Sequence, residues 1–332
     1  MNIPSTQFTV FLTTINTMIG AAYSEAPTFY QEIAETQTMA TLQISFGWAG
    51  KIAKPRVWNG PRVVVSPNAQ MYTVAALPAE LTVGIDKFIL QDDLHGVYYR
   101  TLPDMASQFK RLPDFWIRDM LENSNSQTVG NGGNINPQLG PDGLSAFNTA
   151  HLNNIYNASA GSYSNDLTGG GQTIGGIVTG GTFSLTAFIT AYEYGRTIKA
   201  EDGEAQGIKY NKLMVPPQLE LEASLILKSM SFAPPAWATI TGQVGAADNP
   251  IKAWGVDLIV NPLLASATKW YLFDTTKAFM PLIWCVRTPT EFVQRVNPQD
   301  PNVFDNHLLL WGGEFRGTPA FGPTFLFLRS GP

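Results

Sequence analysis

The C-terminal third of the chain reads almost entirely as short strands, and this feature constrains the fold most. Runs rich in apolar, β-branched and aromatic residues alternate with Pro and Gly clusters, which is typical of strands and turns. The predicted strands cover residues 254–260, 269–273, 281–286, 291–296, 308–311 and 323–328. Helical spacing is confined to residues before 229. Because strands and helices do not alternate along the chain, we predict a mixed α+β fold rather than a doubly wound one.

The N-terminal 42 residues carry two predicted helices. Apolar residues recur at helical spacing over residues 5–20, with Ser5 placed to cap the first turn and Gly20 placed to end the helix. A second, short helix is predicted from Pro27, with Phe29, Ile33 and Thr36 on one side. Such an arm needs a surface on which to lie, and another subunit is one candidate.

Residues 43–90 predict an extended hairpin with an unusual local charge. Strand-like segments fall at 43–48, 62–66, 71–75 and 81–90. No acidic residue occurs between Ser45 and Ala79, whereas four basic residues lie within twelve positions: Lys51, Lys54, Arg56 and Arg62. We hypothesise that these side chains contact an acidic neighbour. A solvated face with four charges in water explains the spacing equally well.

The middle of the chain combines helices with a Gly-, Asn- and Ser-rich tract. Residues 92–123 read as helical, with Pro103 in a first turn and Pro113 as a kink or restart. Residues 124–182 predict irregular or flexible backbone, apart from an island around Phe147 and His151. A helix over 184–199, a strand over 213–215 and a helix from Pro216 to residue 227 complete this part.

The composition favours contact with protein over contact with nucleic acid. Only 14% of the 332 residues are charged, against roughly 25% in typical soluble domains. This shortage suggests an exterior that meets other protein, although a neutral surface rich in Asn, Ser and Thr would look the same. The net charge of −5 argues against a surface that binds phosphates.

The numbers of Cys and His residues and the hydropathy argue against disulfide-rich, zinc-binding and membrane-spanning proteins. One Cys and three His residues exclude an intramolecular disulfide framework and an ordinary zinc site. The first 40 residues contain no Lys or Arg, and no apolar run approaches the roughly 18 residues that a membrane span requires. We therefore expect the protein to be made and kept in a cytoplasm-like setting, without a membrane partner.

No motif for catalysis or cofactor binding is present. The chain lacks a phosphate-binding glycine loop, a serine hydrolase elbow and a metalloprotease helix. Cys285 lies in an apolar stretch that favours a buried thiol over a nucleophile. Asp92 and Asp93, followed by His95, fit helix capping, and His151 fits a local hydrogen-bonding role. We predict that the protein is not an enzyme and has no catalytic, cofactor or metal site.

Four blocks, in order, resemble the Mu-like prophage major head subunit family. The first runs from Asp142-Gly143-Leu144 through Phe147 to Thr149-Ala150-His151 and on to Ser164-Asn165. The second covers residues 213–220 with Ala223, and the third pairs residues 270–274 with 281–283. The last covers residues 313–322 with Arg316, although Pro319 and Pro323 depart from the usual pattern. The N-terminal 140 residues match in organisation only.

This resemblance implies a phage major capsid protein with the Hong Kong 97 type of fold. Its parts would be an N-terminal arm (1–42), an extended hairpin loop (43–90), a peripheral domain with a spine helix (91–199), an axial domain (200–288) and a return to the peripheral domain (289–332). The implied function is self-assembly through pentamers and hexamers into an icosahedral shell around the DNA, in the host bacterial cytoplasm. Portal and scaffold proteins, and a decoration protein, would be the other partners.

Within that reading, the four basic hairpin residues would form intersubunit ion pairs. The acidic partners we expect on a neighbouring subunit are Asp92, Asp93 and Asp104.

Two other classes of protein remain open from the sequence. A phage tail or baseplate protein shares the weakly charged, Gly- and Asn-rich composition, and would build tubes or rings instead of closed shells. A capsid-associated hydrolase would need a nucleophile and base pair around a histidine such as His151.

Overall fold

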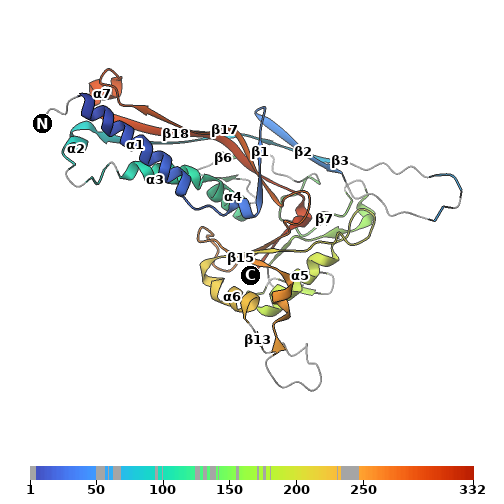
Figure 1. The fold of residues 1–332 in the computed structure, drawn as a ribbon. Helices are drawn as coiled ribbons and strands as arrows, with labels where there is room; N and C mark the ends of the chain where they lie inside the picture. Colours follow the sequence, from blue (N-terminus) through green and yellow to red (C-terminus); the bar gives the residue numbers. More distant parts are fainter. Residues whose placement is uncertain are drawn as a thin grey trace.

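The computed structural model describes residues 5–49, 57–58, 60–62, 69–93, 96–98, 100–123, 128–129, 133–134, 140, 142–154, 157–169, 172–174, 177–179, 181–229, 231–232 and 247–332. Two sheets organise the molecule (Figure 1). A long four-stranded sheet with helices along it forms one lobe, and a five-stranded sheet with its own helices forms the other. The fold is therefore α+β, as predicted.

The four-stranded sheet has the order β1-β17-β18-β4. Its strands are β1 (Ala34–Thr38), β17 (Leu282–Arg295), β18 (Leu308–Phe321) and β4 (Leu77–Asp86). β1 is parallel to β17, and the other pairs are antiparallel. β1 covers β17 only from Leu282 to Val286, and the pairing of β17 with β18 is irregular between Val286 and Glu291.

Three helices cover one face of this sheet: α1 (Ser5–Glu25), α3 (Thr101–Lys110) and α4 (Leu112–Glu122) (Figure 1). Their apolar sides form a core with the sheet because Leu102, Ile117 and Leu121 are fully buried. Aromatic rings fill the layer between helices and strands. Trp284 and Phe315 stack with centroids 5.4 Å apart, and Trp116 lies edge-on to Trp284 at 5.9 Å. Each ring of this kind buries a large apolar area.

The five-stranded sheet has the order β15-β12-β16-β19-β9. The strands are β15 (Asp257–Val260), β12 (Lys212–Val215), β16 (Trp270–Phe273), β19 (Phe327–Gly331) and β9 (Asp166–Thr168). α5 (Leu185–Thr197) and α6 (Glu220–Lys228) belong to the core on one face, and the other face shares the core of the first sheet. Strands buried on both faces explain the continuous apolar runs in the sequence.

The remaining strands form two-stranded pairs. β2 (Gln43–Ala49) and β3 (Ala69–Ala75) make an antiparallel hairpin that projects from the molecule (Figure 1). The smaller pairs are β5 (Thr128–Val129) with β6 (Gly133–Asn134), β7 (His151–Leu152) with β8 (Ser162–Tyr163), β10 (Gln172–Ile174) with β11 (Ile177–Thr179), and β13 (Ser231–Phe232) with β14 (Ala247–Asp248). α2 (Lys87–Gln91) and α7 (Pro301–Asn306) lie together at the far end of the long sheet.

Several predicted helices are confirmed, although the helical segment expected from Asp92 begins only at Thr101. α3 contains Pro103 in its first turn, and α4 restarts at Pro113, as the two prolines predicted. Ser184 caps α5 by accepting a hydrogen bond from the Ala187 amide at 3.2 Å. The strand, turn and helix predicted from residue 213 to 227 appear as β12, a 3-10 turn at Pro217–Leu219, and α6.

Two predictions for the arm are wrong. α1 continues past Gly20 to Glu25 because Ala22 and Tyr23 still pack against the core, and burial outweighs the weak helix propensity of one glycine. The second helix, expected from Pro27, is only a 3-10 turn at Tyr30–Glu32, and Thr36 belongs to β1. Pairing with β17 offers this segment a complete hydrogen-bond ladder that a short isolated helix lacks.

The predicted strand over 81–90 is wrong in its extent and its partner. β4 ends at Asp86, whose carboxylate accepts hydrogen bonds from the amides of Phe88 and Ile89 and so starts α2. β4 pairs with β18 and not with the projecting hairpin. The predicted strand over 62–66 lies largely outside the described residues.

The Gly-rich tract contains more order than predicted. β9 joins the five-stranded sheet, and Phe147 and His151 are fully buried, as expected for the island around them. The sequence-based domain boundaries stay a prediction. However, α5 and Leu328 of β19 belong to the core of the five-stranded sheet, although those boundaries assigned both to the peripheral domain.

Candidate assembly surfaces

The basic residues that we expected to make intersubunit contacts follow β2 in the chain. Lys51, Lys54 and Arg56 lie outside the described residues. Arg62 is exposed, and its guanidinium lies 5.1 Å from the centre of the Trp58 ring. Trp58 is itself 71% exposed, and its indole N–H donates to the Gly60 carbonyl at 2.7 Å. A cation stacked on an exposed aromatic ring presents charge and apolar area together.

The three acidic residues expected on the neighbour differ from one another. Asp93 is engaged locally, because its carboxylate accepts hydrogen bonds from the Val97 and Tyr98 amides, each at 2.9 Å. Asp92 is exposed directly after α2, and Asp104 is exposed in the first turn of α3. Asp92 and Asp104 are therefore both exposed, whereas Asp93 orders its own loop.

A second acidic set lies on the face of the long sheet that points away from the helices. Glu80, Glu314 and Glu291 are directly opposite one another on β4, β18 and β17. All three are exposed, and within the described ranges no cation lies within ion-pair distance of any of them. Like charges at facing positions of a sheet are destabilising, so this row would gain from a cationic partner.

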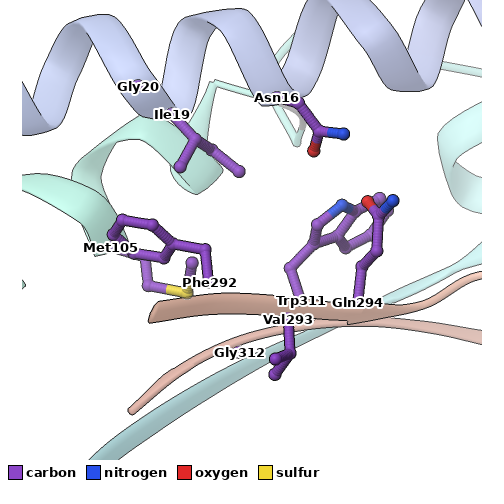
Figure 2. A pocket seen from close by; sticks show the side chains of 9 residues that line it. All are labelled: Asn16, Ile19, Gly20, Met105, Phe292, Val293, Gln294, Trp311 and Gly312. Carbon is purple, nitrogen blue, oxygen red and sulfur yellow. The ribbon is translucent and has the colours of Figure 1, made fainter. Parts of the chain in front are cut away.

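The outer edge of β17 is open beside a cavity. Residues 291–295 pair with β18 on one side, and no strand in the described part of the chain pairs on the other. Beside this edge lies a cavity of about 270 Å³ between α1 and the sheet. Figure 2 shows Asn16 of α1 and Gln294 of β17 beside it, with Trp311 beneath.

Exposed apolar side chains mark the far end of the long sheet. Phe88 and Ile89 of α2 and Phe304 of α7 are all exposed, Phe304 by 75%. Phe88 packs on His307 with ring centres 4.9 Å apart, and the Lys87 amide donates to the His307 carbonyl. Apolar side chains gathered in this way commonly mark contacts between proteins.

The buried titratable groups serve structure. His151 is fully buried, with Nδ1 2.6 Å from a carboxylate oxygen of Asp142 and Nε2 3.2 Å from the Ala146 carbonyl oxygen. Burial would raise the pKa of Asp142, but the hydrogen bond and charge of His151 outweigh it and lower the pKa. Burial raises the pKa of the Cys285 thiol to about 12, which favours the protonated thiol over the nucleophilic thiolate. The predicted local role of His151 and the buried Cys285 are confirmed.

Sequence reasoning missed Asp114, which joins the arm to α4. This carboxylate is 2% exposed and accepts hydrogen bonds from the amides of Phe29 and Tyr30. Burial raises its pKa to about 6, and the two amides and Arg111 only partly offset that effect. Its place directly after Pro113 reads as ordinary helix capping, so the sequence held no signal for a partner 84 positions away.

The glutamate row and the open edge of β17 were missed as well. Glu80, Glu291 and Glu314 are far apart in the chain, and only the register of three strands brings them together. Among the described residues, no group of three His, Cys, Asp or Glu side chains could hold a metal ion. The helices of the same residues include none with the length and hydropathy to span a bilayer.

Solved structures with a similar fold come from phages, two of them from phage capsids. One from the procapsid of bacteriophage JBD30 matches with a TM-score of 0.52 and 20% identity, covering 99% of this chain and 76% of that one. One from the JBD30 capsid decorated with minor capsid protein trimers gives 0.53 and 20%, with 72% and 92% covered. One from Microbacterium phage Oxtober96 gives 0.51 and 11%, with 91% and 90% covered. The fold is thus that of phage major capsid proteins, the Hong Kong 97 type.

The sequence comparisons give the family. The model of the family described as Mu-like prophage major head subunit gpT matches residues 8–174 and 256–330. The chain belongs to this family. It is also 30% identical over 134 residues to the major capsid protein of Escherichia phage Mu, a match that covers 39% of this chain and 44% of that protein. The chain therefore matches less than half of the length of that relative.

Proposed function

We propose that this chain is the shell-forming subunit of a tailed phage head and works by assembly, without catalysis. The family match over residues 8–174 and 256–330 carries this proposal. The low charge, the exposed aromatic hairpin and the open sheet edge fit a subunit that is surrounded by copies of itself. Many modest contacts would then sum over a closed icosahedral shell built from pentamers and hexamers.

Electron microscopy of the purified, concentrated protein tests this function. Closed shells, or flat pentamers and hexamers, are the expected result. Tubes or stacked rings, formed reproducibly without closed particles, would instead indicate a tail protein. Co-expression with the scaffold protein of the same phage distinguishes a subunit that needs help to assemble from one that does not build shells.

The projecting hairpin supplies one proposed intersubunit contact. Lys51, Lys54, Arg56 and Arg62 would pair with acidic residues of a neighbour, and Asp92 and Asp104 are the exposed candidates. Opposite charges on two surfaces steer encounter and fix orientation more than they add affinity. Replacing the four basic residues by Gln should slow shell formation and lower the thermal stability of the shells. Normal shells of normal stability would contradict this contact.

The remaining partners and the location follow from the same proposal. The further partners that this proposal implies are a portal protein and a scaffold protein, with a decoration protein as one more candidate on the outside. The chain would assemble in the host bacterial cytoplasm and remain in the virion. Immunoprecipitation of the assembling protein from infected cells, followed by mass spectrometry of the bound proteins, tests both statements.

A further inference from the structure

The open edge of β17 is self-complementary. Its five residues read Glu291, Phe292, Val293, Gln294 and Arg295, so the ends carry opposite charges and the centre is apolar. All except Phe292 are exposed, and Val293 is exposed by 55%. On this side β17 has no partner among the described strands beyond Val286, where β1 ends. An unpaired edge presents backbone N–H and C=O groups that can add a strand.

The local sequence explains why β1 does not continue along this part of β17. Pro289 lies between the end of the β1 pairing and residue 291, and proline is tolerated in a strand at edges and bulges. The pairing with β18 is irregular at the same place. β1 therefore stops, while β17 continues for five regular residues.

We propose that residues 291–295 of β17 pair antiparallel with the same residues of a second copy of the chain, around a local twofold axis. Such a contact uses the same patch on both copies. Centred on Val293, it places Glu291 opposite Arg295 of the second copy, and Arg295 opposite Glu291 of the second copy. The two Val293 side chains then face each other on the axis.

The proposed pairing also agrees with the pleat of the strand. Residues of equal parity face each other, so helix-facing residues meet helix-facing residues. Phe292 faces the helices, where it packs on Tyr23 and Phe109 at centroid distances of 5.7 and 5.8 Å. Gln294 of the second copy would stand opposite Phe292, at the side of the cavity that Phe292 and Asn16 line (Figure 2).

The glutamate row supplies an independent reason for this partner. Glu291 faces Glu314 on its inner side, and Glu314 faces Glu80. In the twofold pair, the guanidinium of Arg295 from the second copy would extend the row on its outer side. Opposite charges at facing positions of an antiparallel pair stabilise it, and like charges weaken it. The second copy would therefore compensate a repulsion that the single subunit retains.

The inference rests on the proposed function in that a closed icosahedral shell supplies the twofold axes. Cross-linking of the soluble protein tests it without shells. Val293→Cys should form a disulfide-linked dimer under mild oxidation, because facing Cβ atoms in an antiparallel pair lie about 4.5–5.5 Å apart. Leu221→Cys on α6 is the control, since Leu221 is 74% exposed and lies on the other lobe. Equal cross-linking of the two variants would overturn the inference.

A charge exchange makes the test specific for the register. In the Val293→Cys background, Glu291→Arg or Arg295→Glu alone should lower the rate of cross-linking about tenfold, because each creates two like-charge pairs. The double variant Glu291→Arg/Arg295→Glu should restore the rate, since the charges are opposite again. Cross-linking that stays low in the double variant, or high in both single variants, would overturn the pairing.

Two further measurements separate the possible failures. Thermal unfolding of each variant checks that the subunit is intact, and the double variant remains informative if one single variant unfolds. Microscopy of the unsubstituted protein reports on shells independently. Shells without twofold cross-links would reject this inference and leave the proposed function in place. Cross-links together with tubes would support the pairing and contradict the proposed function.

Discussion

The two sheets of the molecule bury their strands in different ways. In the five-stranded sheet, every residue of β16 and β19 is buried, because helices cover one face and the core of the other lobe covers the opposite face. In the four-stranded sheet, β17 alternates between exposed and half-buried residues from Arg287 to Val293, and its outer face carries charge. The central strands of the five-stranded sheet are thus covered by the chain itself. The four-stranded sheet leaves one face and one edge exposed.

The strongest test of this comparison removes a ring from the five-stranded sheet. Trp270 is fully buried and lies edge-on to Phe183 at 5.1 Å. Trp270→Ala should lower the free energy of unfolding by about 3–5 kcal/mol, because it loses apolar burial and leaves a cavity. Urea denaturation measures the loss. Trp58→Ala in the exposed hairpin is the matched control and should change it by less than about 0.5 kcal/mol. Similar losses in both would break the comparison.

The next test uses the buried carboxylate under the arm. The pKa of Asp114 is raised in the fold to about 6 from 3.8, so its favourable contribution is full below about pH 4 and is lost as the pH rises through 6. Asp114→Asn should therefore change the difference in unfolding free energy between pH 4 and pH 7 by up to about 3 kcal/mol. Asp104→Asn, exposed on α3, is the control. Identical pH profiles for all three proteins would contradict the raised pKa.

A smaller effect is expected where a helix approaches the four-stranded sheet. A Cβ atom at Gly313 would lie 2.4 Å from the ring of Phe109, so Gly313→Ala must displace that ring from its place between α3 and β18. The expected loss of stability is about 1–3 kcal/mol. Thermal unfolding followed by circular dichroism measures it. At Gly181 an added Cβ meets nothing within 4 Å, so Gly181→Ala should unfold like the unsubstituted protein.

The smallest effect concerns the exposed face of the same sheet. Glu314 lies between Glu80 and Glu291, so Glu314→Gln removes two repulsions and should stabilise the isolated subunit by about 0.2–1 kcal/mol. The gain should shrink at high salt, because solvent-exposed charges are screened. Denaturation at low and high ionic strength measures both. A loss of stability at low salt would show that the row is compensated within the subunit.

The sequence predicted those helices and strands that are marked by a cap, a proline or an apolar run within a few residues. Ser184 marked the start of α5, the two prolines marked α3 and α4, and the apolar run at 213–215 marked β12. Each of these depends on a cap, a proline or a period that a short window contains. The strands predicted at 281–286 and 291–296 proved to be one strand, because the pairing with β18 is irregular around Pro289 but resumes at Glu291.

Long-range pairing decided what the sequence could not predict. β1 is a strand because β17 is beside it, and Glu32 and Asp257 meet only through Lys212, whose ammonium lies 3.1 Å from each carboxylate. Of the predicted contact residues, Asp93 proved to be occupied by its own loop, because a carboxylate two positions after a short helix can accept the amides of the following turn. No local pattern distinguishes it from Asp92.

Phe147 lies in the core that the two lobes share. Its ring lies 5.9 Å from Tyr271 and 5.2 Å from Phe327 in the five-stranded sheet, and 6.3 Å from Phe321 at the end of β18. The guanidinium of Arg329, which pairs with Asp166, covers the same ring at 4.6 Å. The Phe147 side chain therefore packs against residues of both lobes. Removing this ring would take away packing between the lobes without changing a residue of either sheet.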